Sequence, residues 1–258
     1  MQKLLLIAVV FVAVPAVAQS AFDGTRKMNP QSAQFQAHEK YLLQNGTWQC
    51  DTCVPKISVK ADGNPQKVAG SPYFDTISVR EVNDHTAEIT QTKNGKVVQT
   101  NHLTASDDGR RLSTEFTFTS EGGQEGNGKG YYERTASAPA GANKVSGTWK
   151  PAKFESASDT MTTFTFQTTG DGISMSDRQG DSYMAKFDGK DYPSKGDPGT
   201  TSVAVKKIDA NTIQETDKRR GKIISVTRMT VAPDWKSLKV TTQDKLHNST
   251  ISSTAEKQ

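Results

Sequence analysis

The feature that most constrains this chain is an internal repeat. When the sequence is shifted by 126 residues, residues 45–112 align without a gap on residues 171–238, and 15 of the 68 aligned pairs are identical. Agreement by chance at ordinary composition would give roughly four identical pairs. A period this long indicates a domain duplication, because the units of a solenoid span only about 20–50 residues. We therefore expect the chain to build one fold twice.

The matching segments are those that a shared backbone would require. KADG at 60–63 aligns with KFDG at 186–189, and NGKVV aligns with RGKII in the same register. The start of each copy also recurs, as GTRK at 24–27 and GTWK at 147–150, with an offset of 123 residues. One small insertion or deletion explains the difference between the two offsets.

Both copies have the pattern of strands joined by tight turns. Apolar and polar residues alternate in YFDTISVREV (73–82) and TTSVAVKKI (200–208), and Asn-Gly or Asp-Gly dipeptides stand between such runs. Each copy holds roughly eight such strands. Strands joined by short turns are antiparallel, and about eight of them tend to close into an up-and-down barrel. The predicted fold class is all-β, with two tandem antiparallel up-and-down β-barrels.

The boundary between the copies is predicted from composition. Residues 136–146 are rich in Ala, Pro and Gly, which is typical of a linker. We expect a first β-barrel repeat over 22–140 and a second over 145–258. Only residues 30–43 have helix-forming character, for which we expect a short helix or turn followed by strand. Their counterpart in the second copy, 158–169, is expected to be strand.

Two short segments carry a resemblance to a known family. FDGTRKMN and SGTWKPAK, each followed by a meander of short strands, resemble the lipocalin and fatty-acid-binding-protein group of calycin barrels. In that group a Gly-x-Trp motif opens the barrel and its Trp closes the floor. The resemblance implies that Trp149 is barrel-closing, whereas Arg26 stands at this position in the first copy. The segments DGKDYP at 188–193 and GDPGTTSV at 196–203 also resemble uncharacterised exported bacterial proteins described as lipocalin-like. The resemblance implies a barrel interior that binds small apolar molecules.

The first residues predict export. Lys3 precedes an apolar run from residue 4 to residue 14, and Ala16-Val17-Ala18 follows it, which is the layout of a secretory signal peptide over residues 1–18. Cleavage after Ala18 would place the mature protein in the periplasm or outside the cell. The run is shorter than the roughly 20 residues of a membrane-spanning helix, so no transmembrane segment is expected after cleavage.

The only two cysteines, Cys50 and Cys53, are spaced as C-x-x-C. A structural zinc site needs about four ligands, and a thioredoxin-like pair needs a helix N-terminus, neither of which the surrounding sequence offers. We expect a disulfide within one turn, as export would permit. A thiol-active protein working through this pair is the alternative. In the repeat the two positions fall on Ser176 and Gln179, so the fold makes the same connection without cysteine.

The longest connection shared by the copies is predicted to frame a ligand mouth, because loops on a rigid scaffold carry binding. Its two versions are DGNPQKVAGSP at 62–72 and DGKDYPSKGDP at 188–198. The candidate residues are Asp62, Gly63, Pro72, Asp188, Lys190, Tyr192 and Pro198. Their carboxylates do not follow calcium-loop spacing, and the four histidines are not paired at ligand spacing, so we expect no metal and no cofactor.

Composition and motifs argue against several functions. The basic residues are scattered among acidic ones and the net charge is only +4, which does not favour nucleic acid. No nucleophile motif occurs, so we expect no enzyme. The leading hypothesis is an exported, non-catalytic protein that binds a small apolar or amphipathic molecule in or at the mouth of a barrel. The alternative is an envelope interaction or structural module without internal ligand. The sequence identifies no protein partner.

Overall fold

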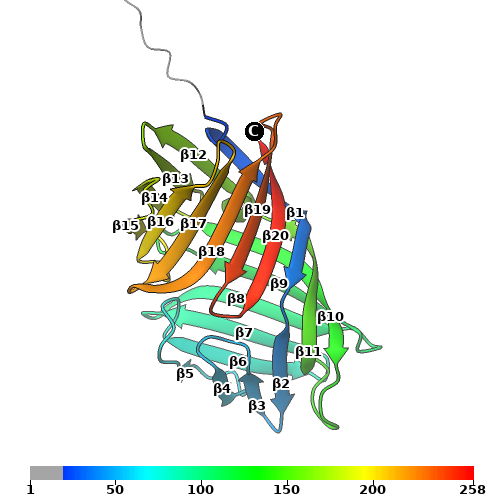
Figure 1. Ribbon diagram of the computed structural model, residues 1–258. Helices are drawn as coiled ribbons and strands as arrows, with labels where there is room; N and C mark the ends of the chain where they lie inside the picture. Colours follow the sequence, from blue (N-terminus) through cyan, green and yellow to red (C-terminus); the bar gives the residue numbers. More distant parts are fainter. Residues whose placement is uncertain (1–19) are drawn as a thin grey trace, which may run out of the picture.

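The computed structural model describes residues 20–258, and the predicted signal peptide at 1–18 lies outside the described residues. The described chain forms antiparallel strands and one four-residue helix, α1 (Asp159–Thr162). The strands make two ten-stranded sheets, one a closed barrel and the other nearly closed. Figure 1 shows the two barrels stacked end to end. The predicted all-β class with two tandem antiparallel barrels is confirmed. Within residues 20–258 no helix has the length and apolar character needed to cross a membrane.

The second barrel is the closed one, in which β1 pairs with both β12 and β20. Its strands, in order around the barrel, are β1 (Gly24–Gln36), β12 (Thr163–Thr169), β13 (Gly172–Asp177), β14 (Ser182–Lys186), β15 (Tyr192–Lys195), β16 (Ser202–Lys207), β17 (Thr212–Arg219), β18 (Lys222–Val231), β19 (Ser237–Asp244) and β20 (Ser249–Lys257).

The first barrel has a gap between β4 and β5, which the side chain of Gln66 bridges. Its amide accepts a hydrogen bond from the Lys60 N–H and donates one to the Lys60 carbonyl, both at 2.8 Å, as a paired strand would. The strands of this barrel are β2 (Glu39–Gln44), β3 (Thr47–Cys50), β4 (Ile57–Lys60), β5 (Gln66–Lys67), β6 (Thr76–Asn83), β7 (Thr86–Lys93), β8 (Lys96–Ala105), β9 (Arg111–Thr119), β10 (Glu125–Ala136) and β11 (Gly147–Ala157).

The two repeats exchange their first strands. β1 opens the first repeat but pairs with β12 and β20 of the second barrel, whereas β11 opens the second repeat but pairs with β2 and β10 of the first. In Figure 1, blue β1 runs beside red β20 in the upper barrel before the chain enters β2 in the lower one. The barrels therefore differ by one strand each from the limits expected from the repeat, 22–140 and 145–258.

Three local expectations need correction. Each barrel has ten strands instead of about eight, because β4, β5 and β15 are only two to four residues long, too short to be counted as strands from their pattern. Residues 30–43 contain no helix: pairing with β20 holds β1 extended to Gln36, and β2 begins at Glu39. The helix lies in the other copy, where α1 occupies the start of 158–169 before β12.

The recurring GTRK and GTWK segments occupy matching places at the outer ends of the barrels. Gly24 and Gly147 both have positive φ, of 117° and 137°, and each begins the exchanged strand. Two residues later, Trp149 is fully buried and its indole donates to the Val145 carbonyl at 2.9 Å. The Arg134 guanidinium lies 4.0 Å from the Trp149 ring centre, an arrangement that a cation–π attraction stabilises.

Arg26 fills the corresponding place in the second barrel by hydrogen bonding instead of aromatic packing. Its side chain is fully buried, and its guanidinium donates to the carbonyls of Ala21 at 2.8 Å and Lys236 at 3.0 Å. Burial lowers its pKa below the ordinary value. A buried guanidinium is stable only when acceptors such as carbonyl oxygens receive its N–H hydrogen bonds. The departure from Gly-x-Trp in this copy therefore does not leave the end of the barrel empty.

Each barrel has its own apolar core, and equivalent positions of the repeat occupy both. Leu112 in the first barrel and Leu238 in the second, 126 residues apart, are completely buried. The first core contains the two largest fully buried side chains of residues 20–258, Trp48 and Trp149.

We expect the exchanged strands to make unfolding a single transition. Leu112→Ala and Leu238→Ala should each lower the free energy of unfolding by about 2–5 kcal/mol, because each removes fully buried methyl groups. Although the two leucines lie in different barrels, both substitutions should shift the same urea transition, with far-UV circular dichroism and tryptophan fluorescence coinciding. Two separate transitions, each moved by only one of the variants, would contradict the coupling.

Candidate functional site

The open ends of the barrels face one another at the junction, and we call these ends the mouths. Loops from the two barrels contact each other there: the Tyr73 hydroxyl lies so close to Gly199 that a methyl group at Gly199 would be 1.9 Å from it. The Arg219 side chain, which donates to the Gly199 carbonyl at 2.6 Å, lies 6.0 Å from the Tyr73 ring centre. These contacts fix the mouths at a short separation.

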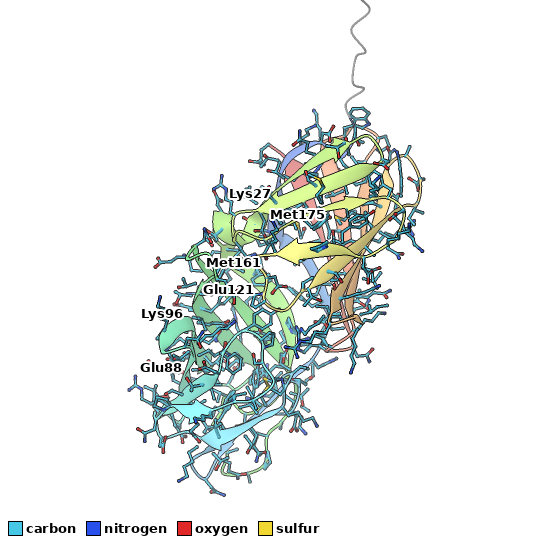
Figure 2. The ribbon with its side chains drawn as sticks, turned by 90° about the vertical axis from the view of Figure 1, so that its left-hand side faces the viewer. Lys27, Glu88, Lys96, Glu121, Met161 and Met175 are labelled. Atoms are coloured by element: carbon cyan, nitrogen blue, oxygen red, sulfur yellow. A yellow bond between two sulfur atoms is a disulfide. The ribbon has the colours of Figure 1, made fainter. Side chains whose placement is uncertain are left out.

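A cleft of about 670 Å³, here called the mouth cleft, opens between the two mouths. In Figure 2, the labelled residues Lys96, Glu121 and Met161 mark this side of the molecule, with Glu121 and Met161 at the level where the barrels meet. The side chains and backbone that line it come from both barrels: Tyr73, Gln91, Lys93, Asn94, Lys96, Val97, Val98, Gln99, Phe116, Phe118, Thr119, Ser120, Glu121, Gly123, Met161, Gln179, Asp181, Gly196, Asp197 and Pro198.

The first barrel contributes two partly exposed aromatic rings to this cleft. Phe116 and Phe118 are on β9, paired with Gly128 and Gly126 of β10. A Cβ at Gly126 would lie 2.3 Å from the Phe118 ring, and one at Gly128 would lie 2.6 Å from the Phe116 ring. Because the glycines have no side chain, both rings lie against the neighbouring strand. The two rings therefore give the mouth cleft an apolar wall without filling the cleft itself.

The second barrel contributes carboxylates. Asp181 and Asp197 line the cleft, and the pKa of Asp181 is raised to about 6 by burial and by the charges of Asp177, Asp197 and Glu121. Two lysines line the cleft. The Lys93 ammonium is engaged, because it donates to Glu121 at 2.7 Å and to the Pro72 carbonyl at 2.7 Å, whereas Lys96 forms no ion pair within residues 20–258.

Two further carboxylates stand on β17 of this barrel. Burial, followed by the nearby charge of Asp217, raises the pKa of Glu215 to about 8, so this carboxyl is largely protonated at neutral pH. Burial also raises the pKa of Asp217. The hydroxyls of Tyr183 and Ser225 bond to Glu215 and Asp217 respectively. Carboxyl groups with raised pKa values cluster at functional sites more often than elsewhere in proteins.

The sequence-predicted loop residues do not gather at one place. Pro198 lines the mouth cleft, and Pro72 lies beside it through its contact with Lys93. Asp62 and Asp188 form matching β-bridges with Arg80 and Lys206 near the outer ends of the barrels. Gly63 has φ of +81° in the turn that follows Asp62. The Asp188 side chain accepts hydrogen bonds from the Lys190 N–H at 2.9 Å and the Tyr192 hydroxyl at 3.2 Å. These outer residues shape a turn, and they do not reach the mouths.

The predicted disulfide is confirmed and lies at the mouth of the first barrel. Cys50 is bonded to Cys53, and the Cys53 N–H also points to the Cys50 sulfur at 3.1 Å. The turn that it closes carries Thr52, whose hydroxyl donates to Glu39 at 2.8 Å. The bond therefore holds a mouth loop in place. Among residues 20–258 no group of three or more His, Cys, Asp and Glu side chains is arranged to hold a metal ion.

The sequence analysis did not identify several residues of this site. For two of them, Phe116 and Phe118, the sequence does contain a recognisable pattern. Alternating glycines at 126, 128 and 130 stand opposite the Phe-x-Phe pair at 116–118, and such spacing in a strand predicts a close approach by a neighbouring side chain. The carboxylates gave no comparable motif, because only the fold brings Asp181 and Asp197 together with Glu121.

Comparisons with known proteins add no relative to this description: no family model, no curated protein and no solved structure matches the chain. Function must therefore be inferred from the fold and from the geometry of the junction.

Reduction of the disulfide should lower stability only modestly. A loop of four residues restricts the unfolded chain little, so reduction is expected to cost about 2 kcal/mol in the free energy of unfolding. The measurement is urea unfolding with and without a phosphine reductant. A loss larger than roughly 5 kcal/mol would mean that the disulfide organises far more than its own turn.

Asp181→Asn should stabilise the protein at neutral pH. The native pKa of Asp181 is about 6 against an ordinary 3.8, so the folded state holds the proton more tightly than the unfolded state. Stability is therefore lost as the pH rises between these values, and the asparagine removes that loss. We expect a gain of about 1 kcal/mol at pH 7, allowing for partial exposure, and no gain at pH 3.5. Thermal melts at both pH values check this, with the fully exposed Asp107→Asn as control.

Proposed function

We propose that this protein binds a small amphipathic molecule in the mouth cleft without transforming it chemically. The observation that carries the proposal is the two-sided cleft of about 670 Å³, with Phe116 and Phe118 on one side and Asp181 and Asp197 on the other. Ligand pockets are typically about 300–1,000 Å³ in volume, mostly apolar, with a few placed polar groups. The mouth cleft has this composition.

The chemistry of the two sides favours a ligand with an apolar part and a positively charged group. Aromatic faces attract cations as well as apolar surface. Asp181 and Asp197 repel one another, Lys93 is already paired with Glu121, and Lys96, the other lysine of the cleft, is not among the charges that act on Asp181. A bound ammonium group would therefore relieve the repulsion between the two aspartates. An alkyl or aryl amine is the ligand class that we propose.

Two finer points belong to the same proposal. The lipocalin-like relationship is supported by the Gly-x-Trp segment that ends in the buried Trp149. Export to the periplasm or beyond is supported by the Cys50–Cys53 disulfide, because disulfides persist in oxidising compartments.

A pair of fluorescent probes tests the ligand class. Dansylcadaverine carries an amine and dansylglycine carries a carboxylate on the same aromatic group. We expect saturable binding of the amine, with the carboxylate bound at least about tenfold more weakly, since one charge-assisted contact corresponds to roughly 1.5–3 kcal/mol. The Asp181→Asn/Asp197→Asn double variant should lose most of this preference, whereas Asp107→Asn should keep it.

The apolar side is tested separately. Phe118→Ala should weaken both probes by a similar factor, because it removes apolar contact without changing charge. Equal affinity for the two probes would refute the proposed charge recognition, and absence of saturable binding for both would refute the cleft as a ligand site. Native mass spectrometry of protein from its own exporting cells would then show whether a ligand is carried elsewhere.

A further inference from the structure

A second cavity lies where the exchanged strands cross, separate from the mouth cleft. This crossover pocket has a volume of about 220 Å³ and shares no lining residue with the mouth cleft. It is lined by Phe35, Ala37, His38, Glu39, Thr52, Thr114, Gly130, Tyr131, Tyr132, Pro151, Lys153, Phe154, Asp244, His247, Ser249 and Ile251.

The strand exchange itself produces this opening. β1 leaves the second barrel at Gln36, and β2 joins the first barrel only at Glu39, so the connection between them has no strand partner. On β11, pairing with β2 ends at Trp149, and Pro151 follows without a backbone N–H that would need one. The two sheets are therefore not hydrogen-bonded to each other at this point. The opening leaves no unpaired backbone N–H at Pro151.

Aromatic side chains form the walls of the pocket. The rings of Phe35 from the second barrel and Phe154 from the first are 5.7 Å apart and tilted by 57°. Tyr132 adds the β10 side, whereas the neighbouring Tyr131 ring is covered by the Arg111 guanidinium, 3.5 Å from its centre. Aromatic rings pack favourably against another flat ring at such separations.

Two polar groups at one end of the pocket, on Glu39 and Tyr132, can still form a hydrogen bond with a ligand. One carboxylate oxygen of Glu39 accepts the Thr52 hydroxyl at 2.8 Å, which leaves the other oxygen without a protein donor in residues 20–258. Burial and the nearby Glu39 charge raise the pKa of Tyr132 to about 12, and no hydrogen bond contributes to this shift. The Asp244 carboxylate, in contrast, is already engaged by His247 at 2.6 Å. Lys153, the one lysine of the lining, is exposed to solvent.

We propose that the crossover pocket binds a small aromatic molecule whose hydrogen-bond donor, an amine or a hydroxyl, reaches Glu39 and Tyr132. The ring lies against Phe35 and Phe154. The free Glu39 oxygen accepts the donor, and the Tyr132 hydroxyl completes its hydrogen bonding. The disulfide turn supports the site by presenting Thr52 to Glu39, which fixes the direction of the free oxygen.

Four naphthalene derivatives test the site by fluorescence titration of the full chain: 2-naphthol, 2-naphthylmethylamine, 2-methoxynaphthalene and 2-naphthoate. We expect the first two to bind, and 2-methoxynaphthalene to bind about tenfold more weakly because it cannot donate. The carboxylate of 2-naphthoate should bind weakest of all. The relative affinity of the amine and the hydroxyl then decides which donor the pocket prefers.

Substitutions in each of the two cavities show which of them binds the probes. Glu39→Gln keeps an oxygen for Thr52 but removes the charge, and should weaken 2-naphthylmethylamine about tenfold; Tyr132→Phe should weaken both donors less. Ala37→Phe should fill the pocket and abolish binding. Glu133→Gln, an exposed change on the same β10, and Asp181→Asn/Asp197→Asn in the mouth cleft should change nothing. Thermal melts confirm that each variant is folded.

Two results would overturn the proposal. Equal affinity for 2-naphthol and 2-methoxynaphthalene would mean that no donor is recognised. Loss of binding in the Asp181→Asn/Asp197→Asn variant with full binding in Glu39→Gln would assign the probes to the mouth cleft, and would leave the proposed function standing without this site.

Discussion

The exchange of first strands between the repeats is the constraint on which the rest of this structure depends. An up-and-down barrel removes its exposed edges only when its first and last strands pair. Here the last strand of each repeat pairs with the first strand of the other repeat: β20 pairs with β1, and β10 pairs with β11. Since β1 leads directly into β2, and β11 leads through α1 into β12, the two connections cross between the sheets side by side. The barrels are therefore stacked end to end, with their mouths together and the Arg26 and Trp149 ends apart.

Much of this architecture could be predicted from the sequence, because the repeat and its turns are local signals. The 126-residue register matches β6 to β16 and β8 to β18 as the structure has them, and the GTRK and GTWK segments do start equivalent strands. The exchange could not be predicted. Two copies of one strand carry the same alternation and the same turn residues, so local pattern cannot say which barrel each of them closes. That choice depends on contacts between residues more than a hundred positions apart.

The candidate site was less predictable for a related reason. Loop composition directed attention to Asp62 and Asp188, which lie at the outer ends, whereas the mouths are lined by strand residues such as Phe116 and Phe118. The missing information was which side chains of each strand point into the barrel. The β17 sequence TIQETDKR has no apolar alternation beyond Ile213, so nothing local indicates that Glu215 points into the barrel. The repeat does indicate it, because Glu215 aligns with Ile89, a core residue of the first barrel.

This internal comparison separates what the fold requires from what it tolerates. At the same interior position the first barrel has an isoleucine, which contributes apolar burial, and the second has a carboxyl whose ionisation burial opposes. Asp217 replaces Gln91 two residues further along the same face. Forming the ten-stranded sheet requires neither acid, since the first barrel forms its sheet without them. The fold therefore does not account for these two buried carboxyl groups, whereas the proposed amine ligand would give them a role. The duplication makes this division possible, because the first barrel supplies the fuller apolar core while the second carries carboxyl groups in its interior.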